Sequence, residues 1–131
     1  MKRFVFAVLA LSLVAGLSVA VAGEKGGSKT IEGTLVDTKC YFMDSANSSN
    51  DHGPMKGCGT ACAKGGTPVG VLTAKGKHYP LVVAAPAVAD HVGKTVRISG
   101  MIREGSFVLD KGEIQVQEGT EWKTVKLGGT M

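Results

Sequence analysis

Alternating polar and apolar positions predict that most of this chain folds into short β-strands. Residues 30–37 alternate in this way, with Ile31 and Leu35 on the apolar side, as expected for a strand with one buried face. Further strand-like segments follow at 69–73, 78–83, 95–103, 107–109, 114–116 and 122–127. Glycine-containing turns separate several of them, and Pro80 favours an edge position for its strand. The pattern therefore predicts a mainly β domain.

Three stretches depart from this two-residue period. Residues 44–54 (DSANSSNDHGP) are rich in turn-forming residues and predict a loop. Residues 55–64 follow Pro54 and stop before two glycines, so they predict a short helix. Residues 84–92 predict a second short helical or turn segment, directly before the 95–103 strand.

The first residues of the chain have the pattern of an export signal. A basic pair, Lys2 and Arg3, precedes an apolar run over residues 4–17, and residues 20–22 (AVA) offer small side chains at a cleavage site. An uncleaved membrane anchor is the alternative, but the apolar stretch ends in small residues and a polar segment follows at once. We predict that residues 1–22 are a cleavable signal peptide and that the protein is periplasmic or secreted.

The remainder of the chain is predicted to form one domain. Residues 23–29 are rich in glycine and lysine and predict a flexible tether, and residues 30–131 form the domain. The signal holds two of the 15 basic residues and none of the 11 acidic ones, which lowers the formal charge from +4 to +2. Because this charge is small and the lysines and arginines do not cluster, we expect no nucleic-acid partner. No stable membrane span is expected after cleavage.

The order of the predicted elements points to one β architecture. Three strands, a short helical segment and further strands follow the order of the oligonucleotide/oligosaccharide-binding (OB) fold. The segments TIEGTLVD and HVGKTVRISGMI resemble the first strand and the passage into the fourth strand of small bacterial OB-fold proteins. We predict an OB-like barrel of five to six strands, with a loop–helix insertion that bears cysteines and a histidine between strands one and two.

This insertion carries the most distinctive chemistry of the chain. Cys40 lies just past the first strand, and Cys58 and Cys62 are four residues apart, which places both sulfurs on one face of the predicted helix. His52 lies in the loop before that helix. Three thiolates and an imidazole form the ligand set of a tetrahedral Cys3His site. We predict that these four residues bind a metal, and soft sulfur ligands favour Zn(II) or Cu(I).

Two other uses of the cysteines stay open. In an oxidising compartment Cys40 is expected to pair with Cys58 or Cys62, and closing a loop of roughly 18–22 residues stabilises a fold by about 3 kcal/mol. The third cysteine is then unpaired, and His52 is an ordinary loop residue. Alternatively, Cys58 or Cys62 acts as a redox-active thiol, although nothing in the sequence marks either as a nucleophile.

The same region resembles a group of small exported bacterial proteins. They share a V-D-x-x-C-[YF] start, a loop histidine, a helix of the C-A-x-x-C type and a G-x-P-x-G entry to the next strand. The match is carried by Asp37, Cys40, Tyr41, His52, Cys58, Cys62, Gly66 and Pro68. The resemblance implies export and a joint role for the four cysteine and histidine positions. The chain departs from the group at Gly59, where many relatives have alanine.

Together these features predict a non-enzymatic exported module whose metal site is structural or carries the metal. The alternative is a disulfide-stapled module without metal, which binds a protein or a small ligand through its barrel face or loops. A thiol redox protein is the second alternative. The sequence contains no recognisable catalytic triad or phosphate-binding loop, so it indicates no enzyme class.

Overall fold

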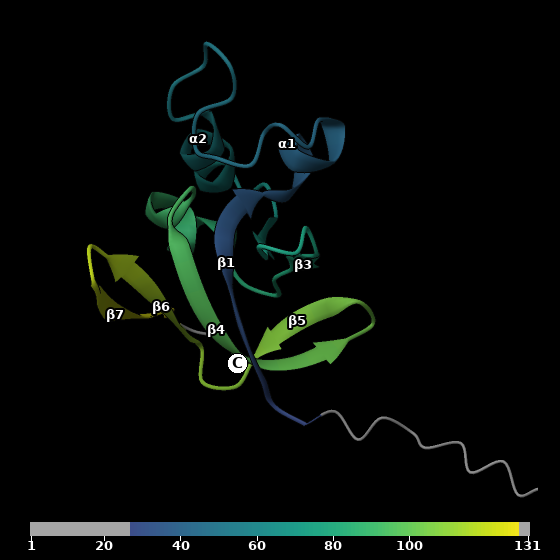
Figure 1. The fold of residues 1–131 in the computed structure, drawn as a ribbon, viewed down its shortest axis with the longest axis vertical. Helices are drawn as coiled ribbons and strands as arrows, with labels where there is room; N and C mark the ends of the chain where they lie inside the picture. Colours follow the sequence, from purple (N-terminus) through teal and green to yellow (C-terminus); the bar gives the residue numbers. More distant parts are fainter. Residues whose placement is uncertain (1–26, 129–131) are drawn as a thin grey trace, which may run out of the picture.

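The computed structural model describes residues 27–128, which form an antiparallel β-sheet with short helices at one end (Figure 1). The predicted signal peptide and most of the predicted tether lie outside this range. No helix of the described part is long and apolar enough to cross a membrane. The elements are β1 (Lys29–Asp37), α1 (Thr38–Met43), α2 (Cys58–Lys64), β2 (Val69–Leu72), β3 (His78–Pro80), a 3₁₀ helix η1 (Ala85–His91), β4 (Thr95–Arg103), β5 (Ser106–Leu109), β6 (Glu113–Glu118) and β7 (Glu121–Lys126).

The seven strands form one sheet in which β1 is central. The strand order is β3-β2-β1-β4-β6-β7, and β5 also pairs with β4. Residues 34–37 of β1 pair with β2, whereas residues 29–34 pair with β4, and all these pairings are antiparallel. Gly33 lies next to this change of partner, and a Cβ atom there would lie only 2.3 Å from the backbone oxygen of Leu72. The missing side chain therefore lets β2 approach β1 closely.

The sheet curls until β3 and β5 meet. Leu81, directly after β3, and Phe107 of β5 form an isolated parallel bridge, and the Val82 N–H donates to the Phe107 carbonyl oxygen at 3.0 Å. This single bridge is not a regular strand pairing, so the sheet is not a closed barrel. The mainly β prediction is confirmed, and the sheet has seven strands rather than five to six.

A continuous apolar core fills the concave side of the curled sheet. Phe107 is its largest fully buried side chain, and α2 and η1 contribute Ala63 and Val88. Since α2 also packs against η1, the insertion is joined to the core through α2. The core residues are Ile31, Leu35, Ala63, Val69, Val71, Leu81, Ala85, Val88, Ala89, Val92, Val96, Ile98, Phe107, Ile114, Val116 and Leu127.

The insertion lies between β1 and β2, as the sequence predicts, but it contains two helices instead of one. The predicted 55–64 helix begins three residues later, at Cys58. The reason is a tight turn ahead of it, in which His52 and Met55 exchange backbone hydrogen bonds of 3.0 and 3.1 Å. The other helix, α1, begins directly at the end of β1 and was not predicted.

Replacing Gly59 by alanine is expected to destabilise the fold by up to about 2 kcal/mol, because a typical overpacking penalty is about 1–3 kcal/mol and the gain in helix propensity offsets about 1 kcal/mol of it. Gly59 is buried in α2, and an added Cβ would lie 2.7 Å from Cγ1 of Val92 and 3.2 Å from Oδ1 of Asn50. Without a clash, the substitution would stabilise the helix by about 1 kcal/mol, so a raised urea midpoint would contradict this packing argument. Gly65→Ala, at the exposed end of the same helix, is the matched control.

Candidate metal centre

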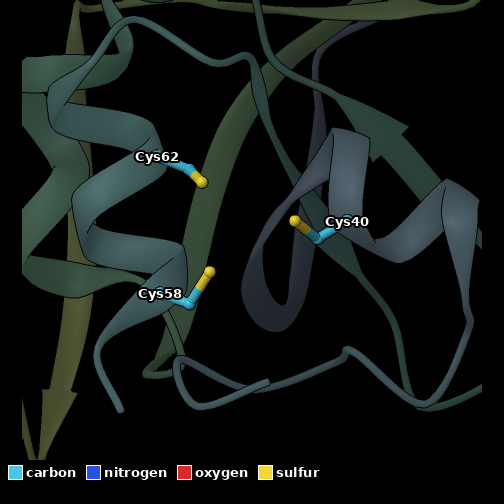
Figure 2. A group of neighbouring side chains, drawn as sticks. All are labelled: Cys40, Cys58 and Cys62. Atoms are coloured by element: carbon cyan, nitrogen blue, oxygen red, sulfur yellow. The ribbon is translucent and has the colours of Figure 1, made fainter. Parts of the chain in front are cut away.

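Three sulfur atoms converge between α1 and α2. The Sγ atoms of Cys40, Cys58 and Cys62 all lie within 4.8 Å of one another. Figure 2 shows the two α2 sulfurs pointing toward Cys40 on α1. The three side chains are half-buried, and all three cysteines are free. Thiol groups from two separate helices therefore face one another without a covalent link.

Asp37 and an aromatic contact hold α1 in place. Asp37 caps this six-residue helix, because its Oδ1 accepts a hydrogen bond of 3.1 Å from the Cys40 N–H. Tyr41 stacks on the His78 ring of β3, with centroids 5.3 Å apart. Thr38 Oγ1 lies 3.3 Å from the same ring's Nε2. These contacts fix Cys40 relative to the sheet.

The start of α2 is held by the preceding loop. The N-cap residue Gly57 has no side chain to cap the helix. Asn50 from the preceding loop caps the helix instead. Its backbone carbonyl oxygen accepts a hydrogen bond from the Gly59 N–H at 2.9 Å, and its Oδ1 accepts one from the Thr60 N–H at 2.7 Å. Cys58 lies at this capped end, so the loop determines where its sulfur points.

Asn50→Ala is expected to lower the free energy of unfolding by about 1 kcal/mol, the usual effect of removing a helix cap. The substitution leaves the Thr60 N–H without its acceptor and loosens the turn that carries Cys58. Urea denaturation measures the change, and Ser45→Ala, an exposed position in the same loop, serves as control. Equal midpoints for the two variants would show that Asn50 does not cap α2.

The surroundings of Cys40 and Cys62 favour protonated thiols. Burial raises the pKa of Cys40, and burial also raises the pKa of Cys62, from 9.0 to about 12. The nearby Asp37 carboxylate adds to both pKa shifts, because its negative charge disfavours the thiolate form. Reactive cysteines have lowered pKa values and cationic neighbours, and Cys40 and Cys62 have the opposite character.

Alkylation of Cys62 is expected to be slow in the folded, metal-free protein. Only the thiolate reacts with iodoacetamide. Because the pKa of Cys62 is raised from 9.0 to about 12, the midpoint of the curve of alkylation rate against pH should lie above pH 9.0. At pH 8 the folded-state rate should be at least about tenfold below that in urea, since one pKa unit changes the thiolate fraction about tenfold. Mass spectrometry with peptide fragmentation separates Cys62 from Cys58. Equal rates in the folded and unfolded states would show that the fold does not raise the pKa of Cys62, and a faster rate in the folded state would indicate an activated thiol.

Asp37 is the only buried acidic side chain among residues 27–128. It is fully buried, with 0% of its surface exposed. Its Oδ1 caps α1, whereas Oδ2 has no hydrogen-bond partner of suitable geometry. An unpartnered buried carboxylate oxygen is unusual, because buried polar atoms nearly always have partners.

His52 does not join the three cysteines in this structure. Its side chain is 4% exposed, and its Nε2 lies 3.1 Å from the Ser49 carbonyl oxygen. Its Nδ1 is buried and has no partner among the described residues. The group of ligand atoms within 4.8 Å of one another contains the cysteines alone. The structure therefore brings together three of the four residues predicted as ligands.

Sequence reasoning missed α1, so it did not predict that Asp37 caps a helix that carries Cys40. One signal was present: an aspartate at the end of a strand, three residues before the first cysteine, matches the spacing of a helix N-cap.

No protein-family model matches the chain, and no significant similarity was found to curated proteins or to solved structures.

Proposed function

We propose that the protein is an exported module that binds one thiophilic metal ion, Zn(II) or Cu(I), through Cys40, Cys58 and Cys62. The observation that carries this proposal is the convergence of three free sulfurs within 4.8 Å from two helices. Thiolates are the ligands that both ions favour in proteins. Export rests on the signal-peptide pattern of residues 1–22.

The arrangement supports reversible metal carriage rather than a purely structural role. The apolar core is continuous and contains none of the three cysteines. We therefore expect the chain to fold without the metal, in contrast to small zinc domains that unfold without it. The half-buried sulfurs also leave the ion within reach of a ligand from another molecule.

The scaffold is proposed to be OB-like. On one side of the central strand β1, β2 pairs with β1 and β3 pairs with β2. On the other side, β4 pairs with β1 and β5 pairs with β4. The two outer strands, β3 and β5, meet at the parallel Leu81–Phe107 bridge. Together with the position of η1 before β4, this neighbour order supports a partly open five-stranded OB barrel extended by β6 and β7.

Metal content and thiol state together test the proposed function. The full chain is expressed with export, purified without chelators under anaerobic conditions, and assayed by elemental analysis and intact mass. We expect one metal ion per chain and three unoxidised cysteines. A chain that contains no metal, has one free thiol and is two hydrogens lighter than the reduced form would contain a disulfide. That result would overturn the proposal in favour of the disulfide-stapled binding module. That alternative has support because the sulfurs are already close and exported cysteines readily oxidise.

A further inference from the structure

The buried Asp37 carboxylate is a metal-ligand candidate that the three-sulfur description leaves out. Asp37 is 0% exposed and lies close enough to Cys40 and Cys62 to influence both thiols. Its Oδ2 is buried without a partner of suitable geometry. None of the ion pairs among residues 27–128 involves Asp37. This buried carboxylate therefore lies near the Cys40 and Cys62 thiols and forms no ion pair with a cationic side chain.

The two oxygens of Asp37 have separate environments. Oδ1 is held by the Cys40 N–H at 3.1 Å, which anchors the carboxylate at the start of α1. Oδ2 is free to bind something else. This division suits a monodentate carboxylate ligand, in which one oxygen maintains the helix cap while the other reaches an ion. Its oxygens are not within 4.8 Å of all three sulfurs, so ligation requires the carboxylate and the cysteines to draw together around the ion.

Charge gives a second reason for a cation at this position. An uncompensated buried carboxylate is strongly unfavourable in proteins, and metal binding leaves it beside thiolates, because thiols lose their protons when they ligate. A carboxylate that stays outside the coordination sphere is then repelled by its neighbours. A carboxylate that binds the same ion is compensated by it.

We propose that Oδ2 of Asp37 is the fourth donor to the ion held by Cys40, Cys58 and Cys62, and that this S3O site selects Zn(II) over Cu(I). The inference rests on the proposed metal-binding function and narrows it to one class of ion. Zn(II) is four-coordinate in most protein sites and accepts sulfur and carboxylate oxygen together. Cu(I) is soft and favours thiolate and thioether ligands, so the carboxylate adds little to its binding.

Asp37→Asn in the full mature chain tests the fourth donor. Asparagine caps helices as well as aspartate does, so α1 is maintained while the anionic ligand is lost. We expect the Zn(II) affinity, measured by chelator competition under reducing conditions, to fall by at least about 10–100-fold, since even outer-sphere partners of metal ligands have effects of this size. The Cu(I) affinity should change by only a few-fold. In the Co(II)-substituted protein, the visible d–d bands should shift in the variant while the sulfur-to-cobalt charge-transfer bands remain.

Two further variants make the result decisive. Asp44→Asn removes the same charge at the other end of α1, where Oδ1 of Asp44 accepts a hydrogen bond from the Ala46 N–H. This variant should leave the Zn(II) and Cu(I) affinities unchanged. Asp37→Ser keeps a capping side chain but removes the carboxylate, and should reproduce the selective loss of Zn(II) if the asparagine variant folds poorly.

The outcomes separate this inference from the proposed function. If the unmodified chain binds neither ion and its thiols are free, the proposed function fails, and the fourth donor with it. If the unmodified chain binds Zn(II) and the Asp37 variants bind it equally well, only the fourth donor is overturned. Equal losses for Zn(II) and Cu(I) would also overturn it, because they would show that Asp37 merely positions Cys40.

Discussion

Cys62→Ser is expected to weaken Zn(II) or Cu(I) binding by at least about 100-fold, because four-ligand zinc sites have apparent binding free energies of about 10–16 kcal/mol, or roughly 2.5–4 kcal/mol per ligand. Serine is close to cysteine in size, so the helix should persist while the soft donor is lost. The sulfur of Cys62 lies within 4.8 Å of both other sulfurs, so its removal leaves only a two-thiolate pair. Cys40→Ser and Cys58→Ser should show losses of similar size.

Competition with a chromophoric chelator under reducing conditions measures these affinities. Ala61→Ser is the matched control, because it introduces the same side chain at an exposed position of α2 next to Cys62. Its affinity should equal that of the unmodified chain. If Cys62→Ser also retained full affinity, the bound ion would have to lie elsewhere, and the three-cysteine site would be wrong.

Saturation with the metal is expected to raise the melting temperature by on the order of 20 °C. A ligand at a thousand times its Kd stabilises the folded state by about 4 kcal/mol, and each kcal/mol raises the melting temperature by roughly 4–8 °C in a domain of this size. Before metal is added, the chain should already melt cooperatively, because its core is continuous without the cysteines.

Calorimetry with and without Zn(II) provides the measurement, and a chelator should reverse the shift. The Cys62→Ser variant at the same metal concentration is the control and should show a much smaller change. A metal-free chain with no cooperative transition would mean that the metal is structural and would contradict carriage. An unchanged melting temperature on addition of Zn(II) would contradict tight binding.

Most of the sheet could be predicted from the sequence because its strands follow a clear two-residue period. The strand β4 occupies the predicted residues 95–103, and β1 begins one residue earlier than predicted. The helix α1 could not be predicted in this way. Its sequence TKCYFM contains mostly residues of modest helix propensity, and its contacts come from His78, far away in the chain.

The candidate site was predicted in part for a similar reason. The i, i+4 spacing of Cys58 and Cys62 determines that their sulfurs share a helix face, and the helix is present. The orientation of His52 depends instead on a turn stabilised by backbone pairing with Met55. That turn places the imidazole against Ser49, and no periodicity or spacing rule describes such a contact.

The two ends of the insertion lie side by side, which makes the site transferable. Asp37 and Val69 are paired residues of β1 and β2, and the Thr38 N–H donates to the Pro68 carbonyl oxygen at 3.0 Å. The strands β1 and β2 therefore pair as in a simple hairpin, and the insertion with its two helices takes the place of the hairpin turn. A protein engineer could therefore test replacing the insertion with a tight turn. Grafting it onto the hairpin of another β protein would also require an apolar surface that receives Ala63 and a neighbouring-strand ring that takes the place of His78 against Tyr41.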